Sequence, residues 1–271
     1  MSANVRTPTS ITFSVWNAIF LREALDRLFD MRFAWLWILL EPVLWIAFHS
    51  FGYRALHVNT VGGMDLTVWI NAGFLPFILW RRTSTQVLHA VDSNIAFFVY
   101  RQVKPFDAAF MRAVLEAFLI APIALIILSM AAAAGYGNTP GITAIDYLPR
   151  DPLRAIFGTI GTWLFALGYG LVTSVTMVLV REMEHIYKIM YLPLYVLSGV
   201  IVPVEAVPPP WRELFLLNPL VHGIEIVRQG FLPVYHTASG ISMTYLYGCA
   251  LGSVFLGLAL YRRFSRELVT R

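Results

Sequence analysis

The chain has 271 residues and a formal net charge of +4; 58% of its residues are hydrophobic and only 13% are charged. Soluble domains carry about 25% charged residues, so a chain with a mean hydropathy of +0.67 lacks the polar groups to cover a water-exposed surface. These values exclude a soluble globular fold and predict an all-α integral membrane protein, with room for about six spanning helices of ~20 residues each.

The first predicted element is an amphipathic helix over residues 11–32. Five charged residues fall within an arc of about 140° on this helix, and apolar residues fill its other side. The charged residues are Arg22, Glu23, Asp26, Arg27 and Asp30. Such a helix is expected to lie in the membrane interface rather than across the bilayer. The alternative is a cytosolic helix that packs on a partner.

Six apolar stretches are predicted to span the membrane. They cover residues 33–51, 66–92, 106–134, 153–180, 186–202 and 241–261. The apolar part of the second stretch ends at Trp80 and is thin for a full crossing, so we expect its polar half to face a wet cavity or protein. The fourth stretch contains four glycines, which let helices approach closely in lipid.

Two further segments are helical but too short to span. Ser93 and Asn94 are cap-type residues that open a short apolar segment, residues 95–100, and Lys104-Pro105 ends it. This pattern predicts a short helix over 94–102, between the second and third spans. Residues 203–233 are interrupted by prolines and hold two short amphipathic pieces. At about 20 residues per crossing, neither piece can cross the bilayer, so a broken, re-entrant segment is expected there.

The distribution of Lys and Arg predicts the orientation. With both termini taken as cytoplasmic, the inner segments hold fourteen basic residues and the outer segments hold five. Cytoplasmic loops carry the excess of basic residues in membrane proteins. We therefore expect cytoplasmic termini and a re-entrant segment on the outer side.

The sequence carries no pattern typical of an enzyme. Its six histidines are scattered, it has no phosphate-binding loop, and no paired carboxylates share a helix face. We therefore expect neither a catalytic nor a metal site, and no cofactor on this chain.

Charged and aromatic residues within the spans are the candidates for function, because ionisable groups are costly in a bilayer. Glu41, just before Pro42, either partners a cationic side chain or lines a translocation path. Arg112 and Glu116 are four residues apart and are expected to pair on one helix face, with a place in the pathway as the alternative. Tryptophans such as Trp35 and Trp45 form either an interfacial belt or stacking platforms for sugar rings.

A basic cluster is predicted from Arg81, Arg82, Arg101 and Lys104. Anchoring at the cytoplasmic surface would alone account for these residues. The alternative is a cationic entrance that attracts an anionic headgroup or polymer. Both interpretations stay open at this stage.

Two stretches resemble a known family. The first is Gln102-Val103-Lys104-Pro105-Phe106-Asp107, followed by Arg112 and Glu116, and the second comprises residues 198–203 and 218–228. Together they resemble the permease subunit of capsule-polysaccharide ABC exporters, within the wider class that exports O-antigen and teichoic acid polymers. The resemblance covers essentially the whole chain, and neither stretch identifies the polymer.

The resemblance implies a homodimer in the bacterial inner membrane, with two copies of a cytoplasmic ATPase subunit that bind ATP and Mg. It further implies periplasmic and outer-membrane polysaccharide export partners, a lipid-linked acidic polysaccharide as cargo, and no nucleic acid. The segment 94–102 would be the coupling helix that docks on the ATPase, and 203–233 the outer gate. The coupling residues would be Asn94, Phe97, Phe98 and Tyr100, and the gate residues Trp211, Asn218, Pro219, Glu225 and Arg228.

Three alternatives remain. The same architecture could carry O-antigen or teichoic acid. A secondary transporter is expected to have an internal repeat that relates two halves of the chain, and none is visible. A membrane enzyme of glycan assembly would need an acidic loop or a histidine cluster.

Overall fold

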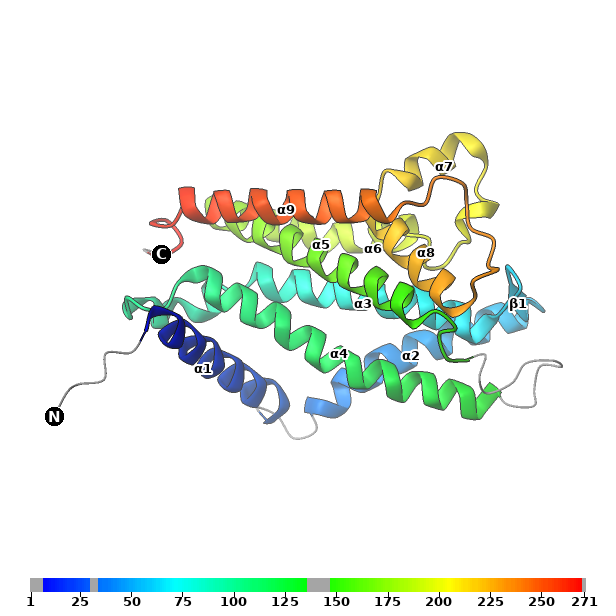
Figure 1. Cartoon of the computed structure of the whole chain (residues 1–271), viewed down its shortest axis with the longest axis horizontal. Helices are drawn as coiled ribbons and strands as arrows, with labels where there is room; N and C mark the ends of the chain where they lie inside the picture. Colours follow the sequence, from blue (N-terminus) through cyan, green and yellow to red (C-terminus); the bar gives the residue numbers. More distant parts are fainter. Residues whose placement is uncertain (1–6, 30–33, 136–146, 270–271) are drawn as a thin grey trace.

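The computed structural model describes residues 7–29, 34–135 and 147–269, and these residues are mostly helical. Most helices run along one long axis (Figure 1). In chain order the elements are α1 (Pro8–Phe29), α2 (Ala34–Ala55), β1 (Thr60–Val61), β2 (Met64–Asp65), α3 (Leu66–Leu88), the 3-10 helix η1 (Asp92–Val99), α4 (Pro105–Gly135), α5 (Pro152–Leu179), α6 (Met183–Leu197), the 3-10 helix η3 (Val204–Ala206), α7 (Pro209–Leu216), α8 (Pro219–Phe231) and α9 (Met243–Arg263).

The bundle has two different ends. One end, called here the terminal end, carries η1 and the C-terminus, and the other, the hairpin end, carries the β1–β2 hairpin and α7 (Figure 1). The antiparallel hairpin pairs Thr60 with Asp65 and was not predicted from the sequence. Its turn uses Gly62 and Gly63 at φ of 56° and 82°, a region that glycine reaches without strain.

Four helices are long and apolar enough to cross a membrane. They are the segments Leu36–Ala55, Pro105–Ala133, Pro152–Leu179 and Met243–Arg263, in α2, α4, α5 and α9. Helix α3 does not meet this criterion, because Arg81, Arg82 and Gln86 make its second half polar, and α6 has only 15 residues. The count of six spans therefore stays a prediction.

The observed helices differ from the predicted ones mainly at their ends. Helix α6 begins at Met183 and stops at Leu197, whereas the predicted span covered 186–202. It stops early because Gly199 adopts a φ of 74° and Pro203 follows, so the chain turns there. The short helix predicted over 94–102 is the 3-10 helix η1, which begins at Asp92. Residues 30–32 of the predicted interfacial helix lie outside the described residues.

Helix α3 is the centre of the bundle and is contacted by α2, α4, α5 and α8. Nearly all its side chains are buried, and Trp69 and Trp80 are among the largest fully buried side chains of the molecule. Helix α5 packs closely on α9, because a Cβ atom at Gly168 would lie 2.5 Å from the backbone nitrogen of Val254. Close helix contact through small residues is typical of membrane bundles, and it confirms the expectation from the α5 glycines.

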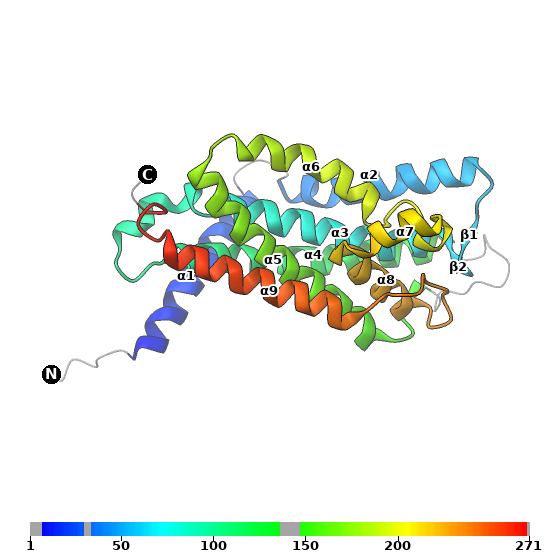
Figure 2. The same cartoon turned by 90° about the horizontal axis from the view of Figure 1, so that it is seen from above.

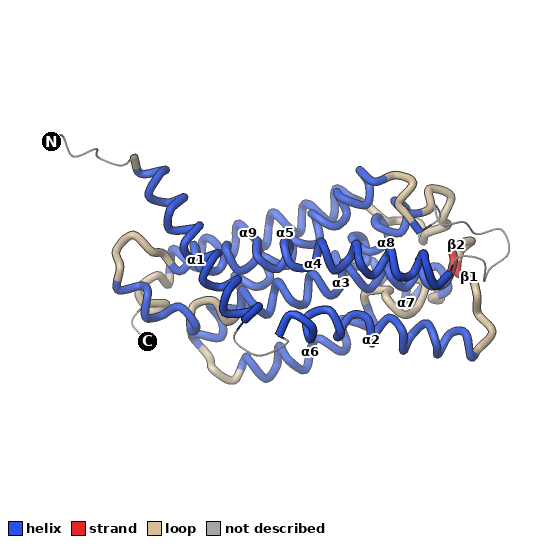
Figure 3. Tube along the Cα trace, turned by 90° about the horizontal axis from the view of Figure 1, so that it is seen from below, coloured by secondary structure: helices blue, strands red, loops and turns tan. Residues whose placement is uncertain are grey.

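Helices α2 and α6 lie on the same flank of the bundle (Figures 2 and 3). They meet through Tyr195, whose hydroxyl lies 3.0 Å from the Nε2 of His49. At the hairpin end, α8 is largely buried while α7 has no buried residue. This flank, formed by α2, α3 and α6, carries the groove described next.

Candidate functional site

Aromatic side chains from three helices line a groove on the α2–α6 flank. A cavity of about 190 Å³ is lined by Trp45 of α2, Phe74, Phe77, Ile78 and Arg81 of α3, and Lys188, Tyr191, Leu192 and Tyr195 of α6. A second cavity, of about 470 Å³, is lined by Trp37, Ile38, Glu41, Arg81, Arg82, Thr85, Gln86 and Tyr191. Because Arg81 and Tyr191 line both cavities, we treat the two as one aromatic groove.

The rings of the groove contact one another. The ring centre of Trp45 lies 6.4 Å from that of Phe74 and 6.0 Å from that of Tyr195, and Phe77 and Tyr195 are 5.0 Å apart. Aromatic pairs at these separations stabilise one another and still offer ring faces to a ligand. Trp45 was predicted as a pathway residue; Trp35 lies in α2, but its side chain is outside the described set.

Glu41 and Arg81 form an ion pair across the groove between α2 and α3. Both side chains are partly exposed, Arg81 by 30% and Glu41 by 40%. This ion pair agrees with the structural role considered for Glu41, that of a partner for a cationic side chain. Both residues also line the cavity, so the two interpretations of Glu41 do not exclude each other.

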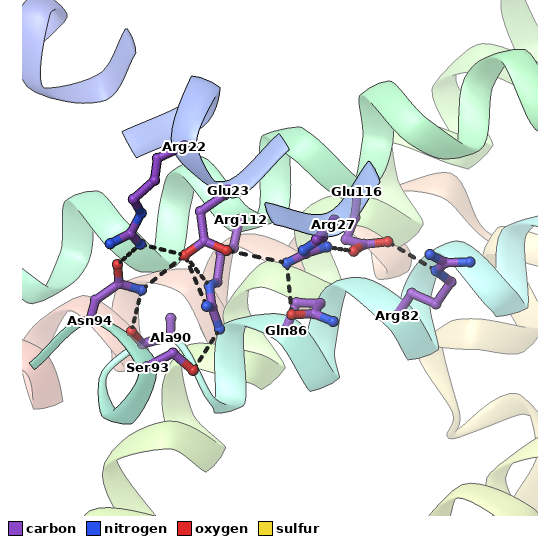
Figure 4. A network of polar contacts seen from close by, with 10 residues as sticks. All are labelled: Arg22, Glu23, Arg27, Arg82, Gln86, Ala90, Ser93, Asn94, Arg112 and Glu116. Atoms are coloured by element: carbon purple, nitrogen blue, oxygen red, sulfur yellow. Dashed lines mark hydrogen bonds and ion pairs between the residues drawn. The ribbon is translucent and has the colours of Figure 1, made fainter. Parts of the chain in front are cut away.

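A chain of ion pairs continues from the groove into the bundle (Figure 4). The Nε of Arg82 donates to Glu116 at 3.0 Å, and its Nη1 donates to the carbonyl of Ile38 at 3.4 Å. Arg27 of α1 pairs with the same Glu116 and donates to Gln86 at 2.7 Å. Glu116 is fully buried, so two cations from different helices share one buried carboxylate.

Arg112 pairs with a residue of α1. Its Nε and Nη2 donate to Glu23 at 3.0 and 2.9 Å, and its Nη1 donates to Ser93 at 3.3 Å. The expected pair between Arg112 and Glu116 is therefore wrong. Because α1 packs against α4, it offers each of these residues an opposite charge from outside its own helix.

Asn94 connects η1 to the same network (Figure 4). Its Nδ2 donates to Glu23 at 3.1 Å and to the carbonyl of Ala90 at 2.9 Å, and its Oδ1 accepts a hydrogen bond from Arg22. We call Glu23, Arg27, Arg82, Arg112 and Glu116, together with Asn94, the α1 network.

Burial and neighbouring charges shift the pKa of Glu23 in opposite directions. Burial raises the pKa of Glu23, but Arg112, Asn94 and Arg27 together outweigh it through charge and hydrogen bonds, so the pKa of Glu23 is lowered overall. Burial lowers the pKa of Arg27 to about 10, so this guanidinium remains charged at neutral pH. The ion pairs of α1 are therefore formed under physiological conditions.

Three charged residues of the predicted arc face the protein: Glu23 is buried, and Arg22 and Arg27 are partly buried, whereas Asp26 is exposed. The exposed side chains of α1 include the large apolar residues Phe13, Leu21, Leu25 and Phe29. The amphipathic pattern identified the charged residues of α1. Their contacts with α3, η1 and α4 could not be predicted from it, because they depend on how α1 packs in the structure. No signal in the sequence identified Glu23 and Arg27 as partners of Arg112 and Glu116.

The predicted basic cluster is split between two places. Arg81 and Arg82 lie in the groove and are paired with carboxylates. Arg101 and Lys104 are exposed in the turn after η1. Helix α3 continues for six residues beyond Arg82, about 9 Å at 1.5 Å per residue, before the chain turns into η1.

The coupling residues are also divided. Asn94 and Phe98 are buried, so they hold η1 in place and cannot contact another protein. Phe97 and Tyr100 are exposed by 38% and 60%, and both line a cavity of about 560 Å³ between α1 and η1. Only this second pair is available to a partner.

Among the gate residues, Arg228 and Glu225 form a buried ion pair, with a distance of 2.7 Å. Arg228 also donates to the carbonyls of Gly199 at 2.7 Å and Val200 at 3.1 Å, and its guanidinium lies 3.9 Å from the ring centre of Trp69. We call these five residues the Arg228 cluster. It joins α8 to α3 and to the turn after α6.

The other gate residues have local roles. Asn218 caps α8 by accepting a hydrogen bond from the backbone nitrogen of Leu220 at 3.1 Å, and Pro219 is the first residue of that helix. Trp211 of α7 is 63% exposed. Within the described residues, no group of three or more His, Cys, Asp or Glu side chains could hold a metal ion.

The chain is similar to known membrane transport proteins. The model of the ABC-2 type transporter family matches residues 14–232. The polysialic acid transport protein KpsM of Escherichia coli is 32% identical over 259 residues, which is 93% of this chain and 94% of KpsM. The capsule polysaccharide export inner-membrane protein CtrC of Neisseria meningitidis serogroup A is 25% identical over 258 residues, 93% of this chain and 91% of CtrC.

A third relative is the capsule polysaccharide export inner-membrane protein BexB of Haemophilus influenzae. It is 21% identical over 254 residues, which is 94% of this chain and 92% of BexB. All three relatives are covered almost end to end, and the resemblance to capsule exporters is thereby confirmed. The chain belongs to the ABC-2 type transporter family, and its relatives include inner-membrane proteins of capsule polysaccharide export.

Proposed function

We propose that the chain is the permease subunit of an ATP-driven exporter that carries a lipid-linked acidic capsular polysaccharide across the bacterial inner membrane. The observation that carries this proposal is the aromatic groove, in which ring faces and the cations Arg81 and Lys188 lie together. Sugar rings pack on aromatic faces, and guanidinium and ammonium groups bind carboxylates. The names of the relatives support a capsular cargo.

The proposed topology has six spans and cytoplasmic termini. Helices α3 and α6 would complete the count, because α3 runs through the bundle centre and its polar residues have protein partners rather than lipid. The apolar residues exposed on α1 support its place in the inner interface. The terminal end would then be cytoplasmic, and η3, α7 and α8 would form the re-entrant outer gate.

The partners follow from the same arrangement. The aromatic groove is open on one flank, and a second copy facing it would enclose a conduit, as the implied homodimer requires. Two ATPase subunits, which bind ATP and Mg, would dock on the exposed Phe97 and Tyr100 at the terminal end. Periplasmic and outer-membrane export proteins would continue the path. This chain itself would catalyse no reaction.

The α1 network gives the proposed coupling a physical route. A movement of η1 on ATP binding would act on Asn94 and Ser93, which contact Glu23 and Arg112. The remaining ion pairs of the network would then transmit the movement to Arg82, which lines the groove. ATP binding would thus reshape the groove around the polymer without direct contact between the two sites.

A matched pair of substitutions on α2 tests the role of the groove. Trp45→Leu removes an aromatic face from the groove, whereas Phe48→Leu removes one from a residue that is 71% exposed. In cells that depend on this chain, we expect Trp45→Leu to reduce surface polymer and Phe48→Leu to leave it unchanged, at equal amounts of protein in the membrane. Equal export by both variants, or failure of an ATPase to co-purify, would refute the proposal.

The alternatives differ in their support. Membership of the ABC-2 type transporter family argues against the alternative that the chain is a secondary transporter. An O-antigen or teichoic acid cargo would use the same architecture, but the names of the relatives favour a capsular polymer.

A further inference from the structure

The larger cavity of the groove contains a cation that is accessible from outside. Of its two arginines, Arg82 is only 14% exposed and is paired with the buried Glu116. Arg81 is 30% exposed, and its partner is Glu41, itself 40% exposed. The cavity of about 470 Å³ beside this pair also offers the polar side chains of Thr85, Gln86 and Tyr191. A group that enters the cavity thus meets Arg81 rather than Arg82.

Glu41 is placed so that it can leave Arg81. It lies on α2, while Arg81 lies on α3, so their contact is a contact between helices. Glu41 is followed by Pro42 inside α2, and a proline in a helix removes a backbone hydrogen bond and permits a bend. Because Glu41 lines the cavity together with Thr85 and Gln86, its carboxylate would still have polar side chains around it when it moves away from Arg81. Breaking this pair therefore strands no buried charge, unlike the pairs of the α1 network.

We propose that the carboxylate of Glu41 binds Arg81 at the position that an anionic group of the cargo takes during transport. A carboxylate or phosphate that enters the groove would displace Glu41 from Arg81. The identity of the cargo rests on the proposed function. Arg81 keeps one anionic partner throughout the exchange, and the displaced carboxylate of Glu41 stays in the groove. The incoming group would keep the charge-assisted hydrogen bonds of the guanidinium.

This exchange has a physical consequence for transport. An internal carboxylate that competes for Arg81 lowers the affinity of the groove for each anionic group. A conduit needs sites that bind well enough to admit a group and weakly enough to release it. A polymer with an acidic group on every unit would then pass Arg81 stepwise, with Glu41 returning between units.

The test uses the purified complex of this chain with its ATPase in lipid nanodiscs. The probe is a sialic acid hexamer, an oligomer of the acidic sugar in the name of the relative from Escherichia coli, and maltohexaose is the neutral control. If Glu41 occupies Arg81 for about nine-tenths of the time, its removal strengthens apparent binding about tenfold. We therefore expect Glu41→Gln to bind the acidic hexamer about tenfold more tightly, and maltohexaose no differently.

Three further variants isolate the exchange. Glu41→Asp should remain close to wild type, because it keeps the carboxylate. Adding Arg81→Gln to Glu41→Gln should abolish the gain, because the cation is lost. Glu267→Gln removes an exposed carboxylate near the C-terminus and should leave binding unchanged. Equal melting temperatures would show that all variants are folded.

Lipid composition separates two sources of the anion. In nanodiscs of phosphatidylglycerol, a gain in bound lipid rather than hexamer for Glu41→Gln would identify a lipid phosphate as the displacing group. If Glu41→Gln gains affinity for neither anion, the exchange is refuted. The proposed function survives that result if the hexamer still stimulates ATPase activity equally in wild type and Glu41→Gln, and fails separately if no ATPase co-purifies.

Discussion

Two buried ionic clusters stabilise the molecule in different ways. In the Arg228 cluster, one cation faces one carboxylate, and its other partners are backbone carbonyls and a fully buried ring. In the α1 network, three arginines share two glutamates, Arg22 also pairs with Glu23, and nearly all contacts join side chains (Figure 4). The first cluster lies around α8, and the second links α1 to α3, η1 and α4.

The difference lies in how many arrangements each cluster allows. Backbone carbonyls cannot move without the segments that carry them, so the Arg228 cluster fixes one position of α8 against α3. Carboxylates shared by several arginines can exchange partners when a helix shifts, because each cation has another acceptor within reach. A fully satisfied buried network makes a structure rigid, and one with alternative partners permits two states. We infer a rigid hairpin end and a movable α1.

The largest expected effect is that of Arg228→Met. It leaves Glu225 buried without a cation and removes the donor to two carbonyls, and breaking a buried pair costs about 3–5 kcal/mol. The purified chain in detergent should unfold at clearly lower denaturant concentration and temperature. Arg212→Met is the control, because Arg212 lies on the exposed α7 and donates only to nearby carbonyls. Equal losses of stability in Arg228→Met and Arg212→Met would show that the Arg228 cluster stabilises the chain no more than an exposed arginine does.

A smaller loss is expected for Glu116→Gln. It removes the carboxylate shared by Arg27 and Arg82, but both arginines are partly exposed, by 15% and 14%, and can turn to water. We expect about 2–3 kcal/mol, less than for Arg228→Met. Faster hydrogen exchange confined to α1 would accompany it. Should α8 exchange faster as well, the two clusters would not be independent.

Gly73→Ala tests the fit of the Arg228 cluster. A Cβ atom at position 73 would overlap the Nη2 of Arg228 and lie 3.1 Å from its Cζ. Since carbonyls and the ring of Trp69 hold the guanidinium, we expect a loss of about 1–3 kcal/mol in unfolding experiments. Gly52→Ala is the matched control, because nothing lies within 4 Å of its added Cβ. A Gly73→Ala chain as stable as Gly52→Ala would mean that Arg228 can shift.

The sequence predicted these clusters to different degrees. It predicted two short amphipathic pieces within residues 203–233, where the structure has α7 and α8, because prolines divide this segment. It pointed to Arg228 and Glu225 only through a family resemblance. The acceptors of Arg228 are carbonyls about thirty residues earlier in the chain, at Gly199 and Val200, and no pattern of side chains reveals them.

For α1, periodicity found the charged residues but not their partners. The rule for residues four apart suggested that Arg112 would pair with Glu116, because both lie on one face of α4. The rule fails where another helix packs on that face and supplies opposite charges, as α1 does with Glu23 and Arg27. Hydropathy also located α2, α4, α5 and α9, the four helices that are long and apolar enough to cross a membrane, whereas the polar second half of α3 falls short of that criterion.

The smallest expected effect is a dependence of stability on pH through Glu23. Arg112 holds the pKa of this carboxyl below its usual value in the folded chain, so the stabilisation it provides is complete above that usual value. As the pH falls through the folded pKa, Glu23 takes up a proton and the stabilisation is lost. The melting temperature of wild type should therefore exceed that of Glu23→Gln at pH 7, and the gap should narrow as the pH falls below about 4.5. An equal gap at every pH would mean that shape, and not charge, holds α1 on α4, and the proposed exchange of ionic partners in the α1 network would lose its basis.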